Sequence, residues 1–191
     1  RKIETIAISE NRRDEIFQKI TKQCHEGSQV FWVCPIIDES EVLECKAAIN
    51  TYDEIRKKLH EINVGLIHGR MKMQEKEKIM NEFRSKKIDL LVSTTIIEVG
   101  LDVPNATVII IENSERMGLS QLHQLRGRVG RGSKKSTCIL VYKTGISELA
   151  RNRIDILRKN TNGFDIAKED LDIRGPGEIL GKDKKAISIL K

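Results

Sequence analysis

Short runs of β-branched and aliphatic residues alternate along the chain with longer segments whose apolar positions recur every three or four residues. Such runs predict buried strands, and the longer period predicts amphipathic helices. The predicted strands are residues 4–9, 29–34, 64–68, 88–93, 107–111 and 136–142. The predicted helices are residues 11–27, 41–62, 74–87, 118–126 and 146–160. A glycine at position 27 ends the first helix.

The order of these elements indicates an α/β fold with a parallel sheet. Near-continuous apolar strands that alternate with helices are typical of a sheet covered by helices on both faces. In such sheets, ligands bind beyond the carboxyl ends of the strands. The segments that follow strands are therefore the candidate binding positions: residues 34–40, 68–73, 93–104 and 112–118.

The pattern changes near residue 145, where a charged helix is followed by a Gly/Pro-rich segment. We expect a main lobe over residues 1–144 and a small C-terminal helical segment with a hook over residues 145–191. A chain that opens at Arg1 rather than Met is expected to be part of a longer protein.

Composition narrows the class of protein. The chain has 191 residues, of which 39% are hydrophobic and 32% charged, as in an ordinary globular protein. Its longest apolar runs are too short to cross a bilayer. Its four cysteines have neither C-x-x-C spacing nor a histidine at zinc-ligand spacing, which favours free thiols in the cytoplasm. The net charge of +6 is a modest bias toward polyanions.

Arginine and glycine interleave in the segment QLHQLRGRVGRG, residues 121–132. Arg128 and Arg131 are three residues apart, so one helical turn would bring both onto roughly the same face. Two close guanidiniums repel unless an anion lies between them, and phosphate matches their geometry. The glycines would let the backbone approach such a ligand. A solvated basic loop is the alternative, but the absence of any acidic residue from 116 to 135 favours phosphate binding.

Two other segments follow strands. In STTIIEVGLDVP (93–104), the hydroxyl residues Ser93, Thr94 and Thr95 could hold a phosphodiester backbone, and Asp102 could accept a hydrogen bond from a ribose hydroxyl. A helix cap at Thr94 or Thr95 is the alternative. The segment LIHGRM (66–71) carries a His-Gly-Arg turn whose alternative is a plain polar turn.

Two further patterns fail on inspection. GEILGKD (177–183) lacks the first glycine of a P-loop, and Asp183 stands where a magnesium-binding hydroxyl is required. IIDES (36–40) resembles an acidic metal motif, but Pro35 interrupts its strand.

Together, these segments resemble the second RecA-like lobe of superfamily-two helicases. QLRGRVGR (124–131) matches the Q-x-x-G-R-x-G-R motif of that group in full. Residues 99–132 are similar to the form shared by the bacterial RecG and Mfd families, and VCPIIDESE (33–41) and DLDIRGPGEILG (170–181) are closer to RecG. One departure stands at Lys184, Lys185 and Ala186, where the family carries Gln-Ser-Gly.

The resemblance implies a role for each candidate residue. ATP with Mg²⁺ would bind between this lobe and a first lobe that carries the P-loop. Arg128 and Arg131 would meet the phosphates, Gln124 would sense them, and Gly100 and Asp102 would contact the sugar. The coupling of hydrolysis to movement would fall to Arg174 and Glu178. The DNA backbone would be held by His68, Gly69, Arg70, Ser93, Thr94 and Thr95.

The implied function is ATP-driven remodelling of branched DNA, such as stalled forks and Holliday junctions, in bacterial recombination and repair. The partners would be branched double-stranded DNA and the first lobe and wedge domain of the same protein, in the cytoplasm at the nucleoid and away from membranes. An Mfd-type transcription-repair translocase, an RNA helicase and a nucleic-acid-binding module without ATP chemistry are the alternatives. Without a P-loop, the chain alone should be inactive.

Overall fold

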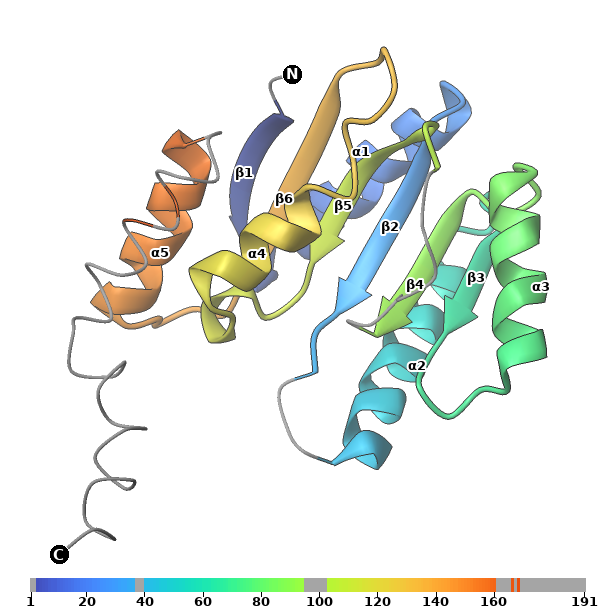
Figure 1. Cartoon of the computed structure of the whole chain (residues 1–191), viewed down its shortest axis with the longest axis horizontal. Coiled ribbons are helices and arrows are strands. Elements are labelled where there is room, and N and C mark those ends of the chain that lie inside the picture. The colour runs from blue at the N-terminus through green and yellow to red at the C-terminus, as the bar shows by residue number, and fades with distance from the viewer. Residues whose placement is uncertain (1–2, 37–39, 95–102, 161–165, 167, 169–191) are drawn as a thin grey trace, which may run out of the picture.

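The computed structural model describes residues 3–36, 40–94, 103–160, 166 and 168, and it contains one parallel sheet (Figure 1). The six strands are β1 (Ile3–Ser9), β2 (Gln29–Cys34), β3 (Val64–Ile67), β4 (Leu90–Thr94), β5 (Ala106–Ile111) and β6 (Ser136–Tyr142). Their order in the sheet is β1-β6-β5-β2-β4-β3, and every neighbouring pair is parallel. The predicted fold class is confirmed.

Among the described residues, four α-helices lie between strands and a fifth follows β6. They are α1 (Arg13–His25), α2 (Glu41–Lys58), α3 (Met73–Arg84), α4 (Leu119–Arg126) and α5 (Glu148–Lys159). Two short 3-10 helices, η1 (Glu10–Arg12) and η2 (Ser114–Arg116), precede α1 and α4. None of the helices in the described ranges is long and apolar enough to span a bilayer.

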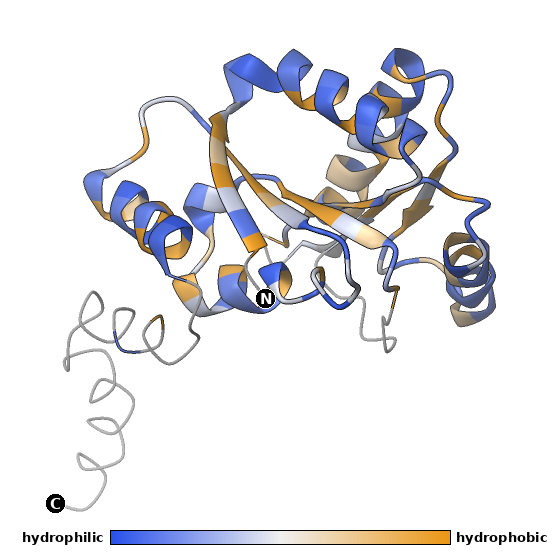
Figure 2. Cartoon of the chain, turned by 90° about the horizontal axis from the view of Figure 1, so that it is seen from above, coloured by the Kyte–Doolittle hydropathy of each residue, from blue (hydrophilic) through white to orange (hydrophobic). Residues whose placement is uncertain are grey.

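Successive residues of each strand enter two separate cores, because side chains alternate across a sheet. Phe31, Val33 and Ile109 pack with α3, α4 and α5 on one face. Trp32 and Ile110 pack with α1 and α2 on the other. Figure 2 shows the helices on both sides of the sheet with their apolar sides turned inward. This double covering explains why the strands read as unbroken apolar runs.

The largest differences from the predicted boundaries lie between α2 and β4. Helix α2 ends at Lys58, and strand β4 begins at Leu90 rather than at residue 88. The Asp89 carboxylate accepts a hydrogen bond from the Asn63 amide at 2.9 Å, and the Asn63 carbonyl accepts from Asp89 N at 2.8 Å. Because Asp89 is used in this turn, the strand starts two residues later than predicted.

Buried Arg126 joins helix α4 to helix α5. Its guanidinium donates to the carbonyls of Leu157 at 2.6 Å and Asn160 at 2.9 Å, and to the Thr5 hydroxyl at 3.3 Å. The two carbonyls belong to the C-terminal end of α5, where carbonyls have no partner within the helix and a positive charge is favourable. Burial lowers the pKa of Arg126.

Helix α5 is therefore part of the same core as the sheet. It packs on β1, η2 and α4, and Ile154 and Leu157 are buried in the core that α3 and α4 share. The division of the chain at residue 145 stays a prediction.

We expect Arg126→Ala to lower the free energy of unfolding by about 2–4 kcal/mol, because it leaves buried carbonyls at the end of α5 without a donor. Urea denaturation followed by circular dichroism measures this. Arg128→Ala is the matched control, because Arg128 is exposed, and it should change stability by less than about 0.5 kcal/mol. Equal effects of the two substitutions would contradict the anchoring role.

Candidate functional site

The predicted site residues that the structure describes lie at two opposite edges of the sheet. His68 and the residues after it follow strand β3, and Ser93 and Thr94 end strand β4. A Cβ built on Gly130 would lie 3.1 Å from Ile3 and 3.9 Å from Ser136, the first residues of β1 and β6. Because all strands run the same way, their starts and their ends form different edges, roughly 20 Å apart for strands of six residues. We call the end of the sheet at which all strands start the amino edge, and the end at which they all finish the carboxyl edge. Neither term refers to an outermost strand.

The arginine segment is a turn at the amino edge and not a continuation of helix α4. The helix ends at Arg126. Two backbone hydrogen bonds then close the turn: Arg128 N donates to Leu125 O at 3.0 Å, and Val129 N donates to Arg126 O at 3.3 Å. Gly130 then has a φ of +85°, which a helix does not contain. The expectation that one helical turn aligns Arg128 and Arg131 is wrong for this reason.

The turn nevertheless presents both arginines outward. Val129 between them is only 3% exposed and packs in the core, whereas Arg128 and Arg131 are exposed. Gln124 is also exposed, on the last turn of α4. The buried valine fixes the position of the turn, so the three polar residues project from a rigid part of the fold.

The glycines of this turn are explained by contacts within the chain. A Cβ on Gly132 would lie 2.6 Å from the carbonyl oxygen of Pro104, closer than real Cβ atoms approach. Gly130 requires its left-handed φ and also lies against Ile3. Contacts within the chain are therefore enough to explain Gly130 and Gly132, without the predicted close approach of a ligand.

At the carboxyl edge, residues 68–71 form a tight turn after β3. Met71 N donates to the His68 carbonyl at 3.2 Å, and Lys76 donates to the Gly69 carbonyl at 3.3 Å. Gly69 and Arg70 are exposed, and His68 is half-buried. Burial, reinforced by Lys76 and Arg70, lowers the pKa of His68. The ring is therefore neutral near pH 7 and would act through hydrogen bonds rather than charge.

Ser93 and Thr94 lie deeper than expected. Ser93 has no exposed surface, and Thr94 is 5% exposed. Ser93 pairs in register with Ile67, directly before His68, so the ends of β3 and β4 are adjacent. Within the described residues, neither the Ser93 hydroxyl nor His68 Nδ1 has a hydrogen-bond partner. These buried polar atoms lie beneath the exposed turn at residues 68–71.

Several predicted residues fall outside the described residues. They are Thr95, Gly100, Asp102, Arg174, Glu178 and the three residues 184–186. Their roles stay predictions.

A crevice at the carboxyl edge lies between β2 and β5. From these two neighbouring strands the chain runs in opposite directions, through α2 to β3 and through α4 to β6, and such a switch point leaves a gap between the connections. A cavity of about 280 Å³ lies there, and its lining includes Arg13, Cys34, Glu112 and Arg116.

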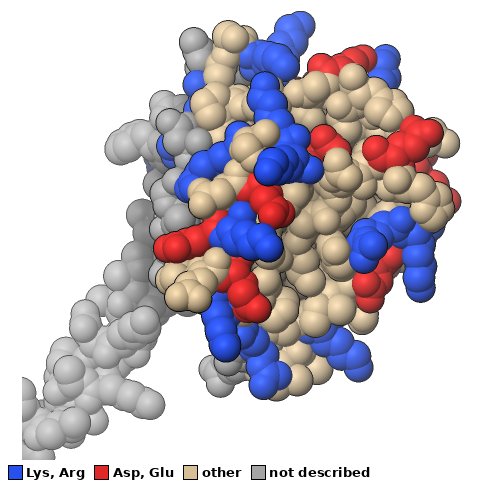
Figure 3. All heavy atoms as spheres, turned by 90° about the vertical axis from the view of Figure 1, so that its right-hand side faces the viewer, with Lys and Arg blue, Asp and Glu red and all other residues tan. Residues whose placement is uncertain are grey.

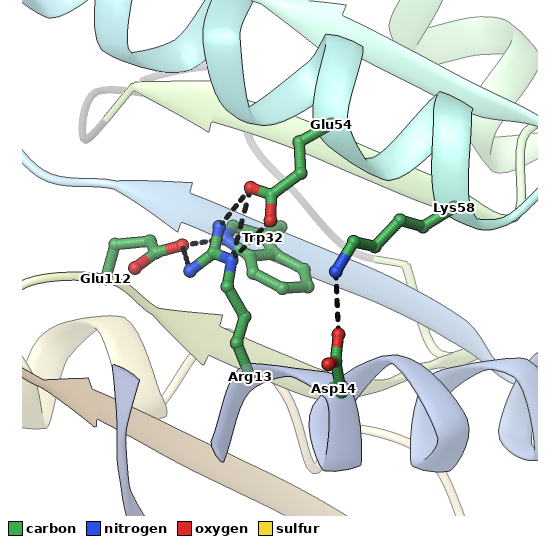
Figure 4. Close-up of polar contacts among 6 residues, drawn as sticks. All are labelled: Arg13, Asp14, Trp32, Glu54, Lys58 and Glu112. Atoms are coloured by element: carbon green, nitrogen blue, oxygen red, sulfur yellow. Dashed lines mark hydrogen bonds and ion pairs between the residues drawn. The ribbon is translucent and has the colours of Figure 1, made fainter. Parts of the chain in front are cut away.

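Arg13 and Glu112, which no sequence motif singled out, line this crevice and contact each other (Figure 4). Arg13 donates to Glu54 at 3.0 Å and pairs with Glu112 at 2.5 Å, and Trp32 donates to Glu112 at 3.0 Å. The guanidinium also stacks over Trp32 at 5.0 Å. Burial alone would lower the pKa of Arg13, but the two carboxylates outweigh it and raise the pKa. The signal in the sequence was that Glu112 directly follows a predicted strand.

Comparison with known proteins identifies a matching family. The model of the helicase conserved C-terminal domain matches residues 11–133. The ATP-dependent DNA helicase RecG of Haemophilus influenzae is 52% identical over 190 residues, which are 99% of this chain and 27% of that protein. RecG of Escherichia coli K12 is 54% identical over 180 residues, which are 94% of this chain and 26% of that protein. The chain spans about a quarter of the length of these relatives.

Solved structures agree with the fold. A structure of RecG bound to a three-way DNA junction superposes with a TM-score of 0.77 at 43% identity, over 93% of this chain and 23% of that one. Yeast Dbp5 bound to RNA and ADP BeF3 superposes with a TM-score of 0.61 at 15% identity, over 90% of this chain and 44% of that one. The second likeness concerns the fold alone.

We expect Gly132→Ala to destabilise the protein by about 1–3 kcal/mol, because the new methyl group would overlap the Pro104 carbonyl and the backbone must move. Gly127→Ala is the matched control, since its Cβ would lie at an ordinary 3.4 Å from Gln124 O, and its stability should be unchanged or raised by up to about 1 kcal/mol. Thermal and urea unfolding of the two variants check this. A Gly132→Ala variant as stable as the control would show that the turn and Pro104 are not rigidly packed.

Proposed function

The chain belongs to the helicase conserved C-terminal domain family, and from that premise we propose that it is the second RecA-like lobe of an ATP-dependent DNA helicase of the RecG type. In this proposal the amino edge meets the nucleotide and the carboxyl edge meets DNA. The similarity to RecG over nearly the whole chain supports the assignment.

The observation that carries the proposal is the exposed arginine turn. Arg128 and Arg131 complete a motif of the family and project from a turn that Val129 anchors in the core. No acidic residue occurs between positions 116 and 135, so the sequence around the turn contributes only positive charge. This arrangement fits a phosphate chain that a second lobe brings to the turn.

Arg128 and Arg131 would act by electrostatic stabilisation of the transition state. In phosphoryl transfer, negative charge spreads over the equatorial oxygens of the transferred group, and guanidiniums already positioned there stabilise that state. An arginine finger contributes on the order of 10³–10⁵-fold in rate, which equals roughly 4–7 kcal/mol. Gln124, one helical turn before Arg128, is suited to orient the same region.

ATP and Mg²⁺ would be held mainly by the partner lobe, where the metal ion would neutralise charge on the phosphates. This chain would contribute Arg128 and Arg131 to the phosphates. Gly100 and Asp102 would contact the sugar, by analogy with the family motif in which they stand. The proposal predicts that the arginines matter only when the two lobes close on nucleotide.

DNA is assigned to the turn that follows β3. Gly69 and Arg70 are exposed there, and contacts from backbone amides and a guanidinium to phosphates do not depend on base sequence. His68 would add a hydrogen bond as a neutral ring. Ser93 and Thr94 are buried, so we assign them a supporting role beneath the turn. Thr95, outside the described residues, keeps its proposed contact with the DNA backbone.

Branched DNA is the proposed substrate, because the RecG structure similar to this chain is bound to a three-way junction. A first RecA-like lobe and a wedge domain would be partners within the same protein. Arg174 and Glu178 would transmit the movement of the lobes to the duplex.

Two alternatives to the RecG-type helicase lobe remain to be compared with it. An Mfd-type translocase would share this lobe, but the relatives reported above are RecG proteins, which favours the RecG type. A nucleic-acid-binding module without ATP chemistry would use the same arginines to bind DNA. The experiment below separates this second alternative from the motor.

We expect Arg131→Ala to reduce ATP turnover by on the order of 10³-fold or more, because the transition state loses a cation. The assay uses a chimera in which residues 1–191 replace the matched quarter of Haemophilus influenzae RecG, with a three-way junction as stimulating DNA. Turnover is measured by phosphate release, and junction binding by fluorescence anisotropy.

Arg151→Ala, on the exposed side of α5, is the matched control and should leave both measurements unchanged. Junction binding of the Arg131→Ala chimera should stay close to that of the parent chimera. Weakened junction binding with unchanged turnover would support the binding module instead. A parent chimera that folds and binds the junction without turning over ATP would also refute the proposal.

For residues 1–191 alone, we expect no ATP hydrolysis with or without junction DNA, because half of the proposed site belongs to another lobe. Phosphate release over a long incubation at high protein concentration measures this. Hydrolysis that persists through repeated purification and disappears in an Arg131→Ala variant would contradict the shared site.

A further inference from the structure

A second basic feature lies at the amino edge, beside the arginine turn. A pocket of about 450 Å³ opens between the end of α3, the start of β2, the start of β5 and the segment after Arg131. We call it the basic pocket. Its lining residues are Gln29, Arg84, Lys86, Val103, Pro104, Asn105, Gly132, Ser133 and Lys134. Three of these are cationic and none is acidic.

The left-handed backbone conformation of Lys86 is the first observation that points to a function of this pocket. Helix α3 ends in a Schellman motif, with Lys87 N donating to Glu82 O at 2.9 Å and Lys86 N donating to Phe83 O at 3.1 Å. The residue at the position of Lys86 must adopt a left-handed conformation, and its φ is +61°. Glycine is the usual choice there, because a side chain adds strain. A lysine at this position is disfavoured for folding, and a strained residue points to a function.

Two side-chain amides, of buried Gln29 and half-buried Asn105, line the pocket and bond to the segments around it. Gln29 is 2% exposed and donates to the carbonyls of Phe83 at 2.6 Å and Ile88 at 2.8 Å. Asn105 donates to Gly27 O at 2.8 Å and accepts from the Lys134 ammonium at 3.4 Å. The Gln29 bonds fix the start of β2 against the end of α3, close to Lys86. The Asn105 bonds join the residue before β5 to Gly27 and to Lys134.

Two further contacts constrain the sides of the pocket, one near Lys134 and one near Lys86. Gly132 packs so closely on Pro104 that no side chain fits between them. Arg84 is held by Asn81 at 3.2 Å. Figure 3 shows the face of the molecule that α3 covers, where Lys and Arg side chains lie at the upper and the lower end and Asp and Glu side chains lie among them. Positive charge predominates in the lining of the basic pocket itself, which holds Arg84, Lys86 and Lys134 and no acidic residue.

We propose that the basic pocket binds the phosphate groups of a small phosphorylated solute, with Lys86 and Lys134 as its cationic contacts. Ammonium groups bind phosphate as point charges, and two of them on separate walls suit an extended chain of phosphates. The pocket lies at the edge opposite to the turn that we assign to DNA, which favours a solute over a nucleic-acid strand. This inference is independent of the proposed helicase function, because it does not use Arg128 or Arg131.

The test is calorimetric titration of residues 1–191 with tripolyphosphate at low ionic strength, where surface charge is little screened. We expect saturable binding. Lys86→Gly and Lys86→Gln should each weaken it by about threefold to tenfold, the range for losing one charged contact at an open site. Lys134→Gln should act similarly. Because Lys86→Gly also removes backbone strain, its Tm should be unchanged or higher, which separates lost binding from lost folding.

Lys87→Gln is the matched control, since Lys87 is the exposed neighbour of Lys86 and does not line the basic pocket. It should leave the affinity unchanged. The proposal is overturned if tripolyphosphate does not bind, or if Lys87→Gln weakens binding as much as Lys86→Gln. It is also overturned if only Arg128→Ala and Arg131→Ala reduce binding. Tighter binding of a short single-stranded oligonucleotide with the same dependence on Lys86 would assign the pocket to nucleic acid instead.

Discussion

The common direction of the six strands is the constraint on which the rest of this structure depends. A parallel sheet must be covered on both faces, because each connection returns across the sheet as a helix or a long segment. A parallel sheet also places the starts of all strands at one end of the sheet and their finishes at the other end. The pattern of apolar runs therefore fixes two chemically independent edges, and we assign the phosphates of the nucleotide to one and DNA to the other.

The arginine turn illustrates how packing within the chain prepares a surface. Three arginines occur within six residues, yet they differ in environment. Arg126 is buried and holds the end of α5, whereas Arg128 and Arg131 are exposed on either side of buried Val129. The glycines let the turn lie flat against Pro104 and Ile3. A rigid turn matters for electrostatic catalysis, because charges that are already in position need no reorganisation as the reaction proceeds.

The sequence predicted much of the fold because its strands are unusually uniform. Residues 29–34 and 106–111 are mostly apolar and buried on both faces, and all six strands and the five helices occur close to the predicted ranges. Local patterns failed where a distant contact decided the structure. The Asp89–Asn63 bond delays strand β4, and the burial of Ser93 depends on neighbours that no short motif contains. The crevice with Arg13 and Glu112 unites residues 99 positions apart, and the basic pocket unites Gln29 with Lys134, so neither could be read from a single segment.

The amino edge carries more positive charge than the arginine turn alone requires. Arg128 and Arg131 already account for two cations, and Lys86 and Lys134 stand on other segments beside Gly132. Like charges on one edge repel, and a lysine in a left-handed conformation adds strain, so this arrangement lowers the stability of the isolated lobe. The two hydrogen bonds that close helix α3 account for the left-handed backbone of Lys86. Glycine would form the same bonds without strain, so a lysine there is expected where a ligand contacts its side chain. An anion between the lysine-bearing walls would relieve the repulsion without engaging the arginines, which leaves them available for a second lobe.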